Sequence, residues 1–510
     1  MFSGLLSDKT LTKKASLTAV ASILDYGARW FVTFILNPLL VAGLGDFGYG
    51  AWQVLTRTIT YMSPAGGRPT QTLKWTIANQ QASTDYHEKR LQVGSAVIVW
   101  FIFLPLLSLL GAVVTWYIPI WLEAPLEYIP SVRWAAALLV ADLIATNLTG
   151  IPQSVLRGEN LGYKRMGLTT IFVLFGGALM ALALFLKKGL IGIAIAELTT
   201  TTITGFLFFR LARSYVHWFG IARPMISAVK RFLGLSWWYL AWNLVLQLLK
   251  AGDVIILGIF GSVELVTQYS LTRYIPETII GLIAIVVFGI TPGLGGIIGR
   301  GDFEKANRVR NEIMIITWFI VTIFGSTMLL WNQSFVNLWV GEEHFAGKFA
   351  NLMMILMVSQ FVFIRNDANI IDLTLDLRQK VMKGLVSAGL SAGLSIVLIG
   401  PLNMGIIGLA IGFIVGQSIL SVGYPLIVAR IFSVSMYSQL RGILRPASVT
   451  ILLFVSLTIL GNYFSANTWL SLILSVGLTV GLLSLFALYF GVTGNQRKSL
   501  LNRIRKILPN

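Results

Sequence analysis

The sequence has no cysteine and few charged side chains. None of its 510 residues is Cys, three are His, and only 12% are charged. Disulfides, thiol chemistry and metal sites built from clusters of Cys and His are therefore excluded. Soluble domains carry roughly 25% charged residues. With 56% hydrophobic residues and a mean hydropathy of +0.78, the composition indicates a chain that folds in lipid.

Long apolar runs recur from Ser16 to Gly491. About 20 apolar residues cross roughly 30 Å of hydrocarbon as a helix, whereas an outer-membrane barrel would show short alternating runs. The first run, after Met1–Lys14, is interpreted as a retained helix and not as a cleaved signal peptide. The sequence predicts an all-α polytopic membrane protein with about fourteen transmembrane helices, over residues 17–43, 49–75, 91–117, 131–156, 166–186, 189–212, 236–260, 264–298, 311–331, 348–372, 381–400, 404–429, 446–464 and 468–491.

The basic residues predict how these helices cross the membrane. Most of the 39 Lys and Arg lie in the two tails and in every second loop, whereas the alternate loops hold only Arg133, Lys187, Lys188 and Lys348. By the positive-inside rule, both termini are cytoplasmic in a bacterial inner membrane. The formal charge of +18 therefore reflects topology, and no nucleic-acid partner is expected.

An internal repeat appears when the chain is aligned with itself at a shift of 216 residues. Gly189–Ala196 then falls on Gly405–Gly412 with five identities. The same shift places Gly45 on Gly261, Thr56-Arg57 on Thr272-Arg273, and Glu88-Lys89 on Glu304-Lys305. Each copy has six helices, an even number, so the two lobes are expected to insert in the membrane with the same orientation. Transporters built from such parallel repeats bind substrate between their halves and rock one half against the other.

The repeat also predicts a domain division. Residues 1–213 are expected to form an N-lobe of six helices and residues 214–235 a cytoplasmic linker. Residues 236–430 would form the C-lobe, and residues 431–510 the last two helices with a basic tail.

Three further segments carry a family resemblance. Leu44–Trp52 (LGDFGYGAW) follows the first helix, Pro152–Asn160 (PQSVLRGEN) closes the fourth, and Gly252–Gly258 (GDVIILG) lies in the seventh. With the two lobes and the trailing helix pair, the chain resembles the multidrug/oligosaccharidyl-lipid/polysaccharide (MOP) exporter superfamily, and within it the flippases for polyprenyl-diphosphate-linked saccharides. The resemblance implies a MATE-like fold and basic residues in a central cavity that receives the diphosphate. The positions that look like those residues are Arg29, Arg57 and Arg273.

Five basic residues lie inside the predicted spans: Arg29, Arg57, Lys250, Arg273 and Arg365. A charge at the centre of a membrane helix costs roughly 2.5 to 3.5 kcal/mol on insertion scales, so each needs a partner, water or a function. Arg57 has no acid at helical spacing, and the repeat predicts that Arg273 lies across the pseudo-twofold axis from it. Two guanidinium groups there could grip a diphosphate, with Arg29 and Lys250 completing the site.

Four embedded acids are candidates for ion or proton coupling: Asp25, Asp142, Glu197 and Asp253. The alternative is local charge pairing, because Asp25 and Arg29, like Arg273 and Glu277, are four residues apart, and Lys250 and Asp253 are three apart. The chain contains no Gly-x-x-x-x-Gly-Lys-Ser/Thr loop, so ATP hydrolysis is not expected, and no cofactor is predicted.

Two helix breaks are also predicted. Pro64 with Gly66 and Gly67 interrupts the second helix, and Pro292 with three nearby glycines interrupts the eighth. Such breaks act as hinges or line cavities, or are kinks that neighbouring helices tolerate.

The predicted function is flipping of a polyprenyl-diphosphate-linked oligosaccharide from the cytoplasmic to the outer leaflet. The expected partners are this substrate, membrane lipid and enzymes that polymerise or assemble polysaccharide. A MATE-type multidrug or cation antiporter is the first alternative; Asp25 would suit it, but the arginines would repel a cation. A membrane glycan polymerase or ligase is the second, and the longest outer loop offers it only Glu342, Glu343 and His344.

Overall fold

The computed structural model describes residues 9–80, 83–159, 161, 168–234, 237–299, 301–373, 378–492, 494 and 497. Throughout these residues the regular secondary structure is helical. Ten of the helices are long and apolar enough to cross a membrane. The prediction of an all-α, multi-pass membrane protein is therefore confirmed.

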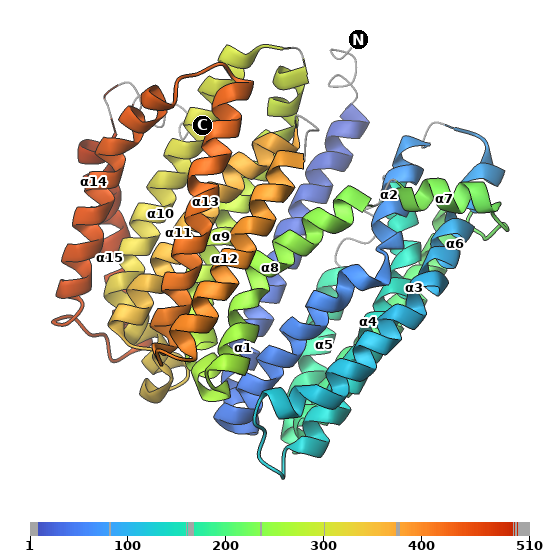
Figure 1. The fold of residues 1–510 in the computed structure, drawn as a ribbon, viewed down its shortest axis with the longest axis horizontal. Helices are drawn as coiled ribbons and strands as arrows, with labels where there is room; N and C mark the ends of the chain where they lie inside the picture. Colours follow the sequence, from blue (N-terminus) through green and yellow to red (C-terminus); the bar gives the residue numbers. More distant parts are fainter. Residues whose placement is uncertain are drawn as a thin grey trace. The chain divides into compact units, whose positions relative to one another are not determined.

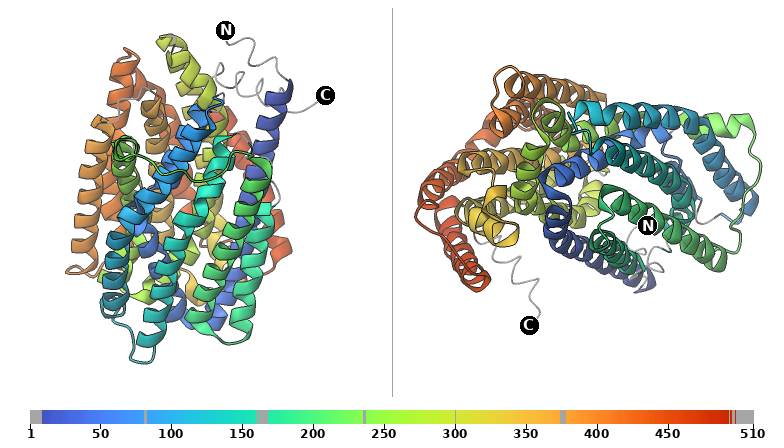
Figure 2. Two further views of the ribbon diagram at one scale, coloured as in Figure 1. Left: turned by 90° about the vertical axis from the view of Figure 1, so that its right-hand side faces the viewer. Right: turned by 90° about the horizontal axis from the view of Figure 1, so that it is seen from below.

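The chain forms two compact units, Met1–Ile259 (unit 1) and Phe260–Asn510 (unit 2). Within each unit the long helices lie side by side (Figures 1 and 2). Unit 1 ends inside α8, a helix that the repeat assigned to the C-lobe; the lobe boundaries at residues 213 and 236 remain a prediction. Unit 1 holds α1 (Lys9–Met62), η1 (Ser63–Gly66), α2 (Pro69–Asn79), α3 (Tyr86–Trp121), α4 (Ile129–Gly158), α5 (Leu168–Phe185), α6 (Gly189–Tyr215), α7 (Ile226–Gly234) and α8 (Trp237–Phe260).

Glycine and proline divide the first helices where the sequence predicts. Gly45 has left the helical conformation (φ 69°, ψ 175°), so α1 is two helices joined at a kink. The second ends in the short helix η1 that contains Pro64, and Gly67 follows with φ 69°. A positive φ is readily adopted by glycine, which has no Cβ. The predicted break in the second helix is confirmed.

The repeat is visible in the backbone of two equivalent turns. Lys187 and Asn403, which are 216 residues apart, have φ of 54° and 51°. Gly189 and Gly405, two residues later in each turn, have φ of 56° and 50°. α6 and α13 start at these glycines. The two copies thus share a turn conformation that few non-glycine residues adopt.

Unit 2 ends with a helix pair outside the repeat. The side-chain nitrogen of Trp318 on α10 donates to Thr450 on α14 (2.8 Å), and that of Trp331 donates to Thr479 on α15 (2.9 Å). Both trailing helices therefore pack on α10. The helices of unit 2 are α9 (Val263–Gly299), α10 (Phe303–Trp339), η3 (Glu342–His344), α11 (Lys348–Asp372), α12 (Arg378–Ile399), α13 (Gly405–Ile431), α14 (Met436–Leu460), α15 (Trp469–Phe486) and η4 (Ala487–Gly491).

The fourteen predicted spans all fall on helices, the first two on α1 with α2 and the others on α3 to α6 and α8 to α15. One detail is wrong: α9 continues through Pro292 to Gly299 without a break. Membrane helices accommodate proline because neighbouring groups satisfy the freed backbone carbonyl. α7 is an additional short helix, inside the predicted linker.

Small residues bring α12 and α13 into close contact. Ser387, Ser391 and Ser395 are completely buried on one face of α12, and Ser387 donates to the Gly416 carbonyl on α13 (2.9 Å). A Cβ on Gly416 would lie 2.6 Å from the Ser391 Cα. Helices in lipid associate through such small-residue contacts, because apolar side chains alone give them no advantage over lipid.

Gly416→Val is therefore expected to destabilise the protein by about 3 kcal/mol, the upper range for overpacking a tight contact. Thermal unfolding of the detergent-solubilised protein measures this. Gly389→Val on α12, the partner helix of this contact, is the control, because a Cβ at Gly389 would meet no atom of another helix within 4 Å. Equal unfolding temperatures for the two variants would show that the contact is dispensable.

Candidate functional site

Two of the predicted arginines lie on α1, on either side of the Gly45 kink. The Arg29 side chain is exposed and that of Arg57 is half-buried. At 1.5 Å per residue, Arg57 lies about 16 Å from the start of its helix at Asp46, close to the middle of a bilayer. Arg57 also has an interaction partner within the protein. At this depth neither Arg29 nor Arg57 is fully enclosed by the rest of the chain.

Arg273 occupies the equivalent place in unit 2. It follows the start of α9 at Val263 by ten residues, and therefore lies about 15 Å from that end. Its Nη1 donates to the Tyr269 hydroxyl, and its guanidinium lies 5.3 Å from the centre of the Tyr269 ring. The Tyr269 side chain is completely buried. Tyr269 thus holds Arg273 in one orientation, and the similar depths of Arg57 and Arg273 agree with the repeat.

The backbone beside Arg273 is also held in place. The Thr272 hydroxyl accepts a hydrogen bond from the Ala346 N–H (2.9 Å), and the Thr272 carbonyl accepts one from Asn332 Nδ2 (2.9 Å). Asn332 Nδ2 also donates to Asn351 (2.8 Å). α9, α10, α11 and the loop after η3 therefore meet next to Arg273.

A charged cluster joins three helices of unit 1. Glu197 on α6 interacts electrostatically with Asp142 on α4 and with Arg29 on α1. The Asp142 carboxyl group also lies beside the Thr201 side chain. These four residues lie between about 12 and 22 Å from the predicted outer ends of their helices. The structure thus brings together three of the predicted site residues, Arg29, Asp142 and Glu197, from distant parts of the sequence.

The remaining predicted site residues contribute less. Asp253 on α8 is buried, and its Oδ1 accepts a hydrogen bond from the Val254 N–H (2.7 Å). The side chains of Asp25 and Lys250 lie outside the described residues, so their proposed roles and pairings remain predictions.

Sequence reasoning missed two buried ion pairs. Lys89 on α3 contacts Glu159 (2.8 Å) in unit 1, and its side chain is only 2% exposed. Arg310 on α10 holds Asp367 on α11 through two hydrogen bonds (2.7 and 2.8 Å) in unit 2. Helical periodicity could have indicated both cations, because Lys89 shares a buried face with Val93 and Ala96, and Arg310 is spaced by three residues from buried Ile313.

The described residues contain no group of three His, Cys, Asp or Glu that could hold a metal ion. The role predicted for Arg29, Arg57 and Arg273 is recognition of an anion by their guanidinium groups. Arginine suits this task because its planar fork of donors matches phosphate oxygens.

Solved structures of transporters share this fold. One, described as the lipid II flippase MurJ in an inward closed conformation, has a TM-score of 0.67 at 15% identity and covers 92% of this chain and 98% of that chain. An inward-facing MATE-family multidrug transporter of the MOP superfamily has a TM-score of 0.62 at 13% identity and covers 81% and 99%. A eukaryotic MATE transporter has a TM-score of 0.54 at 13% identity and covers 88% and 98%.

No protein-family model matches the sequence, and neither does any curated protein. Identities of 13% to 15% establish a common fold and leave the substrate open. The chain therefore has the fold of the MurJ lipid II flippase and of a MATE transporter of the MOP superfamily, as its resemblance to that superfamily implied.

Proposed function

We propose that this protein is a transporter that flips a polyprenyl-diphosphate-linked oligosaccharide from the cytoplasmic to the outer leaflet of a bacterial inner membrane. The observation that carries the proposal is the presence of three arginines at membrane depth, Arg29 exposed and Arg57 and Arg273 half-buried. A guanidinium there is costly unless it meets water or an anion. The likeness to a structure described as a lipid II flippase supports the same substrate class.

In this proposal the diphosphate binds to the arginines while the polyprenyl tail stays in lipid. Arg29 has a second role in this proposal: it leaves Glu197 for the diphosphate and returns to Glu197 afterwards. The acids would then take up a proton or cation while Arg29 is engaged with substrate. Polymerising or assembling enzymes would act on the saccharide after its release, and both termini of the transporter would be cytoplasmic.

Reconstitution tests the proposal. Purified protein in liposomes that carry a fluorescent polyprenyl-diphosphate oligosaccharide should expose the saccharide on the far leaflet at a protein-dependent rate. The second candidate is a cation antiporter, which the Asp142 and Glu197 pair favours because two acids attract a cation. Cation efflux without saccharide translocation would decide for the antiporter.

Glu197→Gln should remove the response of saccharide translocation to an imposed proton gradient, because the amide cannot exchange a proton while it keeps the shape of the side chain. Translocation by the wild type should change with the gradient, and translocation by the variant should stay at the rate measured without one. Glu264→Gln, an exposed position in the first turn of α9, is the control. An undiminished gradient response in Glu197→Gln would exclude Glu197 as the coupling acid.

A further inference from the structure

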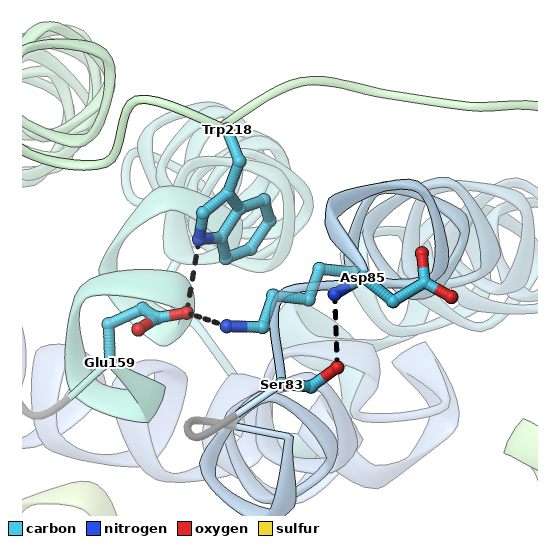
Figure 3. Close-up of polar contacts among 5 residues, drawn as sticks. Ser83, Asp85, Glu159 and Trp218 are labelled. Carbon is cyan, nitrogen blue, oxygen red and sulfur yellow. Dashed lines mark hydrogen bonds and ion pairs between the residues drawn. The ribbon is translucent and has the colours of Figure 1, made fainter.

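The connection between α6 and α7 is anchored to unit 1 through Trp218. The Trp218 side-chain nitrogen donates to Glu159 Oε1 (3.1 Å), and Lys89 Nζ contacts the same oxygen (2.8 Å). Lys89 Nζ also lies 5.3 Å from the centre of the Trp218 ring. Figure 3 shows the Trp218 ring turned toward Glu159 beside the start of α3. Because Lys89 and Trp218 are both buried, this anchor is part of the core.

The backbone of the connection is held as well. Arg90 Nε donates to the Trp218 carbonyl (2.8 Å), and the Ala222 N–H donates to the Arg90 carbonyl (3.2 Å). The contact with α3 is close, because a Cβ on Gly94 would lie 2.0 Å from the Ala222 carbonyl oxygen. Val229 and Phe232 of α7 belong to the same buried cluster as Trp218. The inner side of the whole connection is thus fixed.

The outer side carries apolar and cationic side chains that the protein leaves uncovered. Ile221, Met225 and Ile226 are 68%, 73% and 76% exposed. Arg223 and Lys230, in the same stretch, are also exposed. We call Ile221–Lys230 the linker surface. It lies beside the start of α3 and the end of α6 (Figure 1), which the basic loops place on the cytoplasmic side, where these helices would leave the membrane.

The charge of this region has one sign. No Asp or Glu occurs in the sequence between Glu197 and Asp253, a stretch that contains Arg210, Arg213, Arg223, Lys230, Arg231 and Lys250. Apolar side chains that enter the headgroup boundary beside Lys and Arg are typical of segments that lie on an anionic membrane surface. A soluble partner would have to compete with the lipid already at this depth.

We propose that the linker surface binds acidic phospholipid headgroups of the cytoplasmic leaflet. Arg223 and Lys230 contact the phosphates, while Ile221, Met225 and Ile226 enter the boundary between headgroups and acyl chains. Each cation near such a surface raises the affinity about fivefold. The inference does not depend on the transported substrate, and lipid contact can be measured on protein that transports nothing.

The absence of native cysteine makes single-cysteine labelling of the full chain direct. An environment-sensitive fluorophore on Met225→Cys, in nanodiscs containing phosphatidylglycerol, should be quenched by lipid-attached spin labels. Two variants serve as references. Met382→Cys, 56% exposed on α12, places the fluorophore on a predicted membrane span, and Thr84→Cys, exposed ahead of α3, places it in the aqueous phase. Quenching at position 225 by aqueous iodide as strong as at position 84 would overturn the proposal.

Charge recognition is tested on exposed positions, so that folding is not at risk. Arg223→Gln/Lys230→Gln should lower the ratio of bound phosphatidylglycerol to phosphatidylcholine, measured by native mass spectrometry, by tenfold or more, since each lost cation costs about fivefold. Lys305→Gln/Arg308→Gln removes the same charge on α10, where Arg308 already pairs with Glu304 (2.6 Å). An equal fall in both variants, or displacement of the lipid by millimolar inorganic phosphate, would refute a lipid-specific surface.

Discussion

Replacing Arg57 and Arg273 together with alanine is expected to reduce saccharide translocation in proteoliposomes at least 100-fold, at an unchanged level of folded protein. Hydrogen bonds to charged groups contribute about 1.5 to 3 kcal/mol each, so the loss of two such contacts amounts to a factor of at least a hundred. The effect should be smaller than the product of the single changes if both arginines hold one diphosphate, because each single change already weakens the shared site. Initial rates of substrate exposure on the far leaflet measure it.

Two matched variants sharpen the experiment. Arg57→Lys/Arg273→Lys keeps both charges but loses the planar fork, so its rate should fall between those of the wild type and the alanine variant. Arg308→Ala removes an exposed arginine that pairs with Glu304 and should leave the rate unchanged. Translocation at the wild-type rate by the double alanine variant would refute the role assigned to these arginines.

Removing one partner of the buried pair in unit 2 should have the largest effect on stability. The side chains of Arg310 and Asp367 are 6% and 3% exposed. Asp367→Ala would leave the Arg310 guanidinium buried without its carboxylate, which costs about 3 to 5 kcal/mol. Thermal unfolding of the solubilised protein should show a large drop in the midpoint, independent of substrate.

The neighbouring turn of α10 supplies the control. Arg308 and Glu304 form an exposed pair four residues apart, and Glu304→Ala should cost less than about 0.5 kcal/mol. Arg310→Met/Asp367→Leu replaces both charges by apolar side chains and should recover most of the lost stability, because neither charge is then left alone. If the Asp367→Ala variant unfolds at the wild-type temperature, the prediction is wrong and Arg310 has found another partner or water.

Composition alone does not predict how α7 and the connection before it pack against the rest of unit 1. The sequence predicts that residues 214–235 form a basic cytoplasmic linker, because its charges lie between two apolar runs. It does not reveal that Trp218 is buried against Glu159 and Lys89. That contact joins the end of α4, the start of α3 and the linker, which are brought together only when the helices pack.

The sequence by itself determined the properties that depend on local chemistry. Apolar runs determine the helices, and Gly45 and the turns at Lys187 and Asn403 separate them. Arginines inside apolar runs can be recognised as candidate site residues, because a charged side chain in lipid is energetically unfavourable. Tertiary structure decided which charges interact: Glu197 with Arg29 and with Asp142, and Arg310 with Asp367 across 57 residues of sequence. The physical reason is that hydrophobicity inserts a helix into lipid, but its rotation and neighbours depend on close packing and on polar contacts between helices.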